Sequence, residues 1–247
     1  KAIFRTNGSE SHLFGLEPNF GCCTANFNQA WPKFALSAFM HSGDTVINVL
    51  PVPSELKTKN ERITVETNYP FENSFKYNVE VNEAITFKIR VPSFAENLTV
   101  NGEATDAKEL SFDLIAGEKL EINVAFDVKP TFVDRPHELK TVRCGSLVFS
   151  VPIEYETKMH EYEKDGVVRK FPYCDYELIP KSEWNYGFAD TSLKPEIKTV
   201  SHIPFSQSEP PITIKANLQK IDWELEDGYE SVCAKIPQSR TSVSAVE

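Results

Sequence analysis

Apolar residues recur with two different spacings along the chain. After residue 44, apolar and polar side chains largely alternate, whereas within residues 27–39 apolar side chains recur every three or four positions. Alternation places one side of a segment against a core and predicts β-strands. Such segments are TVINVL (45–50), ERITVETNY (61–69), FKYNVEV (75–81), ITFKIRV (85–91), NLTV (97–100), ELSFDL (109–114) and KLEINVAF (119–126). Their spacing predicts one antiparallel β-sandwich over roughly residues 44–130, with hairpin tips at Asn101-Gly102 and Ala116-Gly117.

A second, less regular set of strands is predicted beyond a linker, KPTFVDRPHE (129–138). The segments are SLVFSVPIEY (146–155), VVRKFPY (167–173), EWNYGF (183–188), PITIKANL (211–218) and SVCAKI (231–236). A proline-rich stretch, residues 195–211, interrupts them. We therefore expect a second β domain after the first.

The three- and four-residue period predicts one amphipathic helix before the first sandwich. Its apolar positions are Phe27, Ala30, Trp31, Phe34, Ala35, Ala38 and Phe39. Pro32 interrupts this pattern, because proline in a helix interior removes a hydrogen bond and clashes with the preceding turn. Either Asn28 caps a helix with Pro32 in its first turn, or a longer helix starts at Thr24 and kinks. We expect the helix to end at residues 41–44, where Gly43 is a suitable C-terminal stop.

Composition excludes some classes of partner. The chain has 247 residues, of which 40% are hydrophobic, and a formal net charge of −10. This acidic balance disfavours nucleic acid and anionic membranes as partners, and no run approaches the ~18 apolar residues of a membrane-spanning helix. Five cysteines, an odd number, make a poor disulfide framework. The sequence does not distinguish a cytoplasmic from a secreted protein. The lack of an initiator methionine suggests a fragment or a processed piece.

Cys22 and Cys23 are the candidate functional residues, because they are adjacent and precede the predicted helix. In one hypothesis they fill a core, since cysteine is among the most buried residue types. In the other they form a site: a helix N-terminus favours the thiolate, and two adjacent thiolates call for a cation such as zinc. Zinc needs further ligands, and the nearest candidates are His12, Glu17 and His41, for which surface or capping roles are the simpler explanation.

Other residues favour structural roles. Cys144, Cys174 and Cys233 lie among predicted strands and are interpreted as core or edge thiols. Aromatic side chains could form a sugar-binding platform or fill the sandwich cores, and the sequence leaves this open. These aromatic residues are Trp31, Trp184, Trp223, Tyr155, Tyr162, Tyr173, Tyr176, Tyr186 and Tyr229.

Three segments together resemble glycoside hydrolase family 127, the β-L-arabinofuranosidase-like proteins. FGLEPNFGCCTANFNQAWPKF (14–34) resembles the family's Cys-Cys-(Thr/Pro)-x-Asn segment. ITFKIRVPSFAENLTVNGE (85–103) resembles its strand pair with a Pro-Ser-(Trp/Phe) turn and a Val-Asn-Gly hairpin. HELKTVRCGSLVFSVPIE (137–154) resembles the Gly-x-Leu-Val strand at which a second sandwich begins.

The resemblance implies a mainly β fold: two consecutive antiparallel β-sandwich domains preceded by the last loop and helix of an (α/α)6 barrel. The implied domains are residues 1–42 for the end of the catalytic barrel, 43–138 for sandwich I and 139–247 for sandwich II. Most of the barrel would then lie outside this chain.

The resemblance also implies a function, that of a retaining glycoside hydrolase acting on plant-type, arabinose-containing glycans. Cys22 matches the family's proposed nucleophile, and Cys22 with Cys23 matches two of its zinc ligands; an upstream cysteine, a zinc-binding glutamate and a glutamate acid/base have no counterpart here. We therefore expect the fragment alone to be inactive, and we expect a complete zinc site only in the intact enzyme. The alternatives are a non-catalytic module for glycan binding or homodimer formation, and a structural β protein with inert cysteines.

Overall fold

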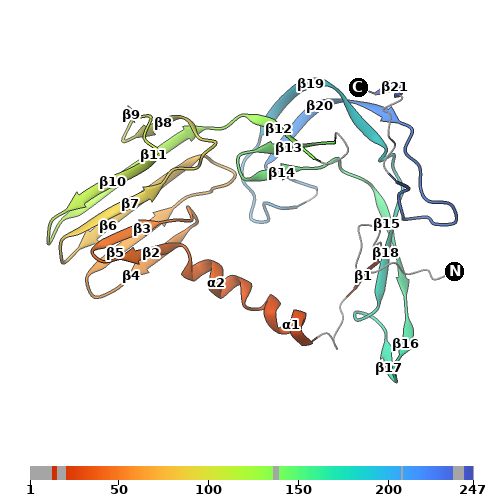
Figure 1. Cartoon of the computed structure of the whole chain (residues 1–247), viewed down its shortest axis with the longest axis horizontal. Coiled ribbons are helices and arrows are strands. Elements are labelled where there is room, and N and C mark those ends of the chain that lie inside the picture. The colour runs from red at the N-terminus through yellow and green to blue at the C-terminus, as the bar shows by residue number, and fades with distance from the viewer. Residues whose placement is uncertain (1–12, 16–20, 136–138, 207, 236–241, 247) are drawn as a thin grey trace.

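The computed structural model describes residues 13–15, 21–135, 139–206, 208–235 and 242–246, and it confirms the predicted mainly β fold. Two short helices, α1 (Gly21–Phe27) and α2 (Ala30–Leu36), lead into a sandwich of two sheets, and smaller sheets follow (Figure 1). Within the described ranges, no helix has the length and apolar character needed to cross a membrane. The domain boundaries at 42/43 and 138/139 stay predictions.

The first sandwich consists of a four-stranded and a six-stranded sheet. The four-stranded sheet has the order β10 (Glu109–Leu114), β7 (Ile85–Arg90), β3 (Thr45–Asn48) and β2 (Phe39–Ser42). The six-stranded sheet has the order β4 (Ser54–Lys57), β5 (Glu61–Glu66), β6 (Ser74–Val81), β11 (Lys119–Asp127), β8 (Glu96–Val100) and β9 (Glu103–Ala104). Each of the seven strand segments predicted between residues 45 and 126 contains a strand of this sandwich.

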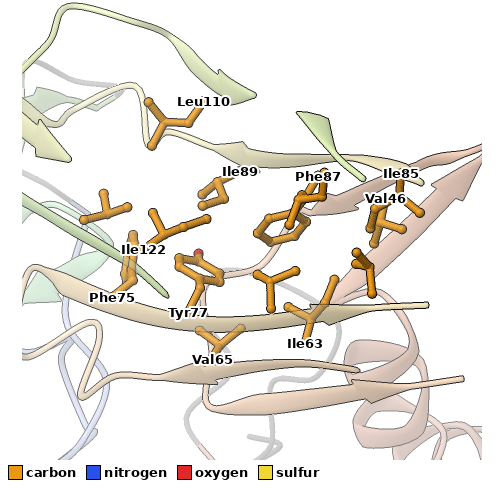
Figure 2. Close-up of a cluster of buried hydrophobic side chains, with 14 of the residues drawn as sticks. Val46, Ile63, Val65, Phe75, Tyr77, Ile85, Phe87, Ile89, Leu110 and Ile122 are labelled. Carbon is orange, nitrogen blue, oxygen red and sulfur yellow. The ribbon is translucent and has the colours of Figure 1, made fainter. Parts of the chain in front are cut away.

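The core lies between the two sheets, where alternating positions of facing strands meet (Figure 2). On β6, every second side chain from Phe75 to Val81 is buried, as the period-two pattern requires. Phe87 on β7 and Ile122 on β11 are fully buried. Tyr77 and Phe87 pack edge to face, with ring centroids 5.7 Å apart. Aromatic and β-branched side chains thus supply most of the apolar surface that holds the two sheets together.

Two details of the predicted sandwich differ from the structure. β3 and β7 run parallel, so the sandwich is not wholly antiparallel. The chain leaves β3 to form three strands of the opposite sheet and returns as β7, and such a crossover permits parallel pairing. Ala116-Gly117 is a turn between β10 and β11, which lie in different sheets, and therefore is not a hairpin tip. Asn101-Gly102 does join the paired strands β8 and β9, and both residues have positive φ, as a type I′ turn requires.

The predicted helix also differs in its length and its end. It is divided into α1 and α2, and Pro32 lies in the first turn of α2, where its missing N–H has no intrahelical acceptor to lose. The N-cap residue that precedes α2 is Gln29 rather than Asn28, and its side chain makes no capping hydrogen bond. The helix ends at Leu36 instead of residues 41–44, because the chain turns into β2, and Gly43 with φ +65° forms the β2–β3 turn.

The C-terminal half of the described chain forms smaller sheets. These sheets are β12 (Pro130–Asp134), β13 (Lys140–Cys144) and β14 (Leu147–Phe149); β1 (Leu13–Gly15), β18 (Asp175–Pro180) and β15 (Tyr155–His160); β16 (Tyr162–Lys164) and β17 (Val167–Arg169); and β19 (Tyr186–Ile197), β20 (Ile212–Ile221) and β21 (Ser242–Val246). Phe132 on β12 and Phe188 on β19 pack edge to face at 4.8 Å. This contact joins the sheet that follows the first sandwich to the long β19–β20 hairpin.

Several sequence predictions for this half were wrong in detail. The expected linker at 129–138 contains β12, which pairs with β13 in a hairpin. The expected strand at 231–236 is reduced, over its described residues, to a single bridge between Leu225 and Cys233. β18 was missed, although it is the central strand of its sheet. Its sequence, DYELIP, does not alternate apolar and polar side chains, because one of its two buried positions is the carboxylate Glu177 and the other is Ile179.

A buried polar network fixes the end of α2 to the first sandwich. Asn48 on β3 donates from Nδ2 to the carbonyl oxygens of Ala38 (3.0 Å) and Leu50 (3.2 Å). Its Oδ1 accepts a 2.9 Å hydrogen bond from the Tyr77 hydroxyl on the opposite sheet. The backbone N–H of Val49 also donates to the Ala38 carbonyl. One asparagine thereby satisfies the Ala38 carbonyl just after α2, the Leu50 carbonyl just after β3 and the Tyr77 hydroxyl of the facing sheet.

We predict that Tyr77→Phe lowers the free energy of unfolding by about 1–3 kcal/mol, because the buried Asn48 Oδ1 loses its donor. Chemical denaturation followed by circular dichroism measures this. Tyr173→Phe is the control, since Tyr173 is half-exposed and its change is expected within about 0.5 kcal/mol of wild type. Equal stability of the two variants would contradict the assigned role of the network.

Candidate functional site

Cys22 lies in the first turn of α1, and its side chain is exposed. Cys23 follows it in the same helix, but the structure does not describe the Cys23 side chain. The hypothesis that the pair fills a core is therefore wrong for Cys22 within the described part of the chain. The helix-dipole argument for a site is also weaker than expected, because a helix of seven residues sums few peptide dipoles.

Two anchors hold the cysteine helix in place. Before it, β1 pairs with β18, with Leu13 opposite Glu177 and Gly15 opposite Asp175. After it, Ala38 is fixed to the first sandwich through Asn48. Figure 1 shows α1 and α2 crossing between these two β regions. The segment that carries Cys22 is thus attached to both halves of the chain.

The apolar stripe on the two helices is exposed. The exposed fraction is 75% for Phe27, 75% for Trp31 and 80% for Leu36, and α2 buries no residue. Phe34 is 44% exposed and lines a cavity of about 380 Å³ together with residues of the sandwich such as Tyr69 and Phe94. Side chains with helical apolar period normally cover a core, so within the described residues this face lacks the packing partner that its sequence pattern predicts.

The other candidate ligands do not gather around Cys22. His41 lies on β2, where its Nε2 is 3.1 Å from the buried carboxylate of Glu61 on β5. His12 and Glu17 lie outside the described residues. Among the described residues, no group of three histidine, cysteine, aspartate or glutamate side chains could hold a metal ion.

Zinc in proteins usually has four ligands in a tetrahedral arrangement. By their chemistry alone, Cys22 and Cys23 match two of these four ligands. The remaining donors would have to come from outside the described part of this chain.

The remaining cysteines follow their predicted structural roles in part. Cys174 is buried, and Cys144 on β13 is partly buried, so that burial raises the pKa of its thiol. Cys233 is exposed beside its single bridge to Leu225.

Trp184 and Trp223 pack edge to face at 5.1 Å, and the Trp223 Nε1 donates to the Ala234 carbonyl. Their mutually inclined rings do not make a flat sugar platform.

Sequence reasoning missed a buried polar cluster on β18. Glu177 is buried, and its Oε2 lies 2.8 Å from Nε2 of His160 on β15. Ser231 Oγ donates a 2.6 Å hydrogen bond to the other carboxylate oxygen. Burial has the largest single influence and opposes ionisation of Glu177, but the hydrogen bonds from Ser231 and His160 outweigh it and lower its pKa. The serine contacts the carboxylate rather than the histidine, so the cluster is not arranged to activate a serine nucleophile.

No local signal could have revealed this cluster, because Ser231 is separated from Glu177 by 54 residues. Leu13, in the segment before the cysteines, lies opposite Glu177 in the β1–β18 pairing. The cluster therefore stabilises the strand on which the N-terminal anchor of α1 depends.

The first sandwich corresponds to a known type of protein domain. Residues 45–118 match the family model described as "Beta-L-arabinofuranosidase, GH127 middle domain", which covers strands β3 to β10. No curated protein matches the chain.

Solved structures support the same relationship at the level of fold. A GH127 beta-L-arabinofuranosidase from Geobacillus stearothermophilus T6 is 18% identical, with a TM-score of 0.54, over 88% of this chain and 34% of the other. A structure described as a glycoside hydrolase is 16% identical, with a TM-score of 0.56, over 92% of this chain and 35% of the other. The chain thus spans about a third of the length of these structures. The predicted resemblance to glycoside hydrolase family 127 is confirmed.

We predict that a brief maleimide pulse on the native chain modifies Cys22 and Cys233 at least about tenfold faster than Cys174, because reaction requires an accessible thiolate. Peptide mass spectrometry measures each site. Labelling in denaturant, where all sites react, is the control. Protection of Cys22 to the same degree as Cys174 would restore the hypothesis of an inert, buried pair.

We predict that the lowered pKa of Glu177 makes the chain acid-sensitive. The stabilisation is present above the unfolded carboxyl pKa, about 4.3, and is lost as the pH falls through the lower native value. Glu177→Gln should therefore show a smaller loss of unfolding free energy over this acidic interval, and Ser231→Ala an intermediate loss. Denaturation at a series of pH values tests this, and identical pH profiles for all three proteins would refute the cluster's role.

Proposed function

We propose that this chain is the C-terminal part of a retaining glycoside hydrolase of the family 127 type, with Cys22 as the nucleophile. The observation that carries the proposal is the order of features along the chain. The exposed Cys22 in its Cys-Cys segment lies before the residues, 45–118, that match the GH127 middle domain, and α1, α2 and β2 connect the two. The share of the solved structures that the chain covers, 34% and 35%, fits a part of a larger enzyme.

The exposed helical stripe supports a missing catalytic domain. Phe27, Trp31 and Leu36 present apolar surface that the described chain leaves open to solvent. Burial of such side chains contributes roughly 1.5–3 kcal/mol each. In the proposed enzyme, α1 and α2 are the last helical segment of an (α/α)6 barrel, and the preceding helices of that barrel cover this stripe.

The proposed reaction uses the sulfur of Cys22. The thiolate attacks the anomeric carbon of the sugar, a C–S bond forms, and the bond between that carbon and the aglycone oxygen breaks. An acid outside the described residues protonates the departing oxygen. The conjugate base of that acid then takes a proton from water, and the water oxygen displaces the sulfur from the same carbon. The Cys22 thiolate is released, and two inversions give net retention of configuration. An exposed nucleophile at the start of a helix, anchored on both sides, suits this role because it holds the reacting atom in a fixed position.

Cys22 and Cys23 are the two residues of this chain that would hold zinc in the intact enzyme. Bound zinc would keep both thiols deprotonated near neutral pH. The substrate that we propose is a terminal arabinofuranoside of a plant-type glycan, which agrees with the name of the matching family and with an acidic chain that disfavours polyanions.

We predict that Cys22→Ser, introduced into the whole enzyme, lowers kcat/KM for an aryl β-L-arabinofuranoside by at least about 10³-fold, because the nucleophile acts only in the chemical step. Initial rates and circular dichroism together separate catalysis from folding. Cys233→Ser is the matched control, an exposed cysteine of the β region that should retain wild-type rates.

The 247-residue chain alone is a further arm of this experiment and should give no turnover. Turnover by the isolated chain, or wild-type rates from Cys22→Ser, would overturn the proposal.

A further inference from the structure

Asn26 lies one helical turn after Cys22 on the same face of α1, and both side chains are exposed. Residues four apart in an α-helix are neighbours, with their Cβ atoms about 5–6 Å apart. Ala25, which also lies about one turn from Cys22, has no polar side-chain atom. Phe27, where the apolar stripe begins, lies about 140° around the helix axis from Cys22. Among the described side chains of α1, Asn26 is therefore the polar neighbour of Cys22.

Gln29 fixes which atom of the Asn26 amide is available. The Gln29 Nε2 donates a 3.2 Å hydrogen bond to Asn26 Oδ1, and the Gln29 backbone N–H donates to the Asn26 carbonyl at 3.1 Å. Asn26 Oδ1 thus already has a donor, whereas Asn26 Nδ2 makes no hydrogen bond with a described residue. That nitrogen carries two N–H donors. One face of α1 therefore presents a sulfur atom and a hydrogen-bond donor side by side.

The stereochemistry of the proposed substrate decides which sugar oxygen this donor meets. In a β-L-arabinofuranoside, the aglycone oxygen, the 2-hydroxyl and C5 project from one face of the ring, and the 3-hydroxyl projects from the other. A nucleophile that inverts the anomeric carbon attacks from the face opposite the aglycone. The sulfur of Cys22 therefore approaches the ring face that carries the 3-hydroxyl.

We propose that Asn26 Nδ2 donates a hydrogen bond to the 3-hydroxyl of the bound furanoside, and that Gln29 is the positioning residue that holds the Asn26 amide in this orientation. The inference rests on the proposed role of Cys22 as nucleophile. Because the sulfur and the amide belong to one turn of one helix, the contact aligns the anomeric carbon with the sulfur for attack.

The same contact sets specificity at one carbon of the sugar. In the C3 epimer of the substrate, the hydroxyl projects from the opposite face of the ring, away from α1. The Asn26 donor is then left without its acceptor, and sites built to bind a hydroxyl discriminate strongly against analogues that do not supply it. The 2-hydroxyl and C5 lie on the far face, so Asn26 does not read them.

Kinetics on deoxygenated substrates test this contact in the whole enzyme. Asn26→Ala should lower kcat/KM for an aryl β-L-arabinofuranoside about 10- to 100-fold, because the hydrogen bond to the 3-hydroxyl is lost. On the 3-deoxy substrate the variant and the wild type should agree within about threefold, whereas on the 2-deoxy substrate the full loss should persist. Comparing the two proteins on the same substrate removes the effect of deoxygenation on intrinsic reactivity.

Gln29→Leu tests the positioning role. It should lower kcat/KM about 3- to 10-fold on the parent substrate, have no effect on the 3-deoxy substrate, and add nothing to Asn26→Ala, because both substitutions act on one hydrogen bond. Asn28→Ala is the matched control: Asn28 is an exposed asparagine in the turn after α1, and its variant should stay within about twofold of wild type. Circular dichroism verifies the fold of each variant, and alanine favours helix more than asparagine does.

The outcomes separate this inference from the proposed function. Wild-type rates from Asn26→Ala, or an equal loss on the parent and 3-deoxy substrates, would overturn the contact with the 3-hydroxyl even if Cys22→Ser is inactive. A Gln29→Leu loss that adds to that of Asn26→Ala would overturn the positioning role. Wild-type rates from Cys22→Ser, or no turnover of the parent substrate by the wild-type enzyme, would overturn the proposed function and this inference with it.

Discussion

The hydrogen bonds of Asn48 are the constraint on which the position of the cysteine segment depends. Asn48 Nδ2 binds the carbonyl of Ala38 at the point where the chain leaves α2, and Asn48 Oδ1 accepts from Tyr77 on the facing sheet. Both side chains are almost completely buried, so each lost bond would leave a polar atom without water. The direction in which the helices leave the sandwich is therefore set inside its core, and the position of Cys22 follows from it.

The first sandwich could be predicted from sequence because its information is local. β6 and β10 alternate clearly, and Asn101-Gly102 can adopt the two positive φ angles of a tight hairpin. The parallel pairing of β3 with β7 could not be predicted, because it depends on the path of the intervening strands through the opposite sheet. β18 was missed for a related reason: its central position arises from pairing with β1 and β15, both distant in sequence.

The candidate site was predicted less completely than the fold. The Cys22-Cys23 pair was recognised from its sequence segment, and the structure adds that Cys22 is exposed between two anchors. The periodic stripe through Trp31 correctly indicated helix, but periodicity reports which face needs a partner and not where the partner lies. The Glu177 cluster carries no local signature, since its members come together only when β15, β18 and the loop at Ser231 have folded.

The two anchors of α1 have different physical characters, and this difference bears on how the site is held. The C-terminal anchor is a side-chain network in a dry core, which changes only when the sandwich opens. The N-terminal anchor is the short pairing of β1 with β18, in a sheet whose opposite edge, β15, is exposed. Glu177 ties that sheet together through its hydrogen bonds with His160 on β15 and with Ser231. Local opening of this sheet would therefore release the N-terminal side of α1 while the Asn48 network still holds its C-terminal side.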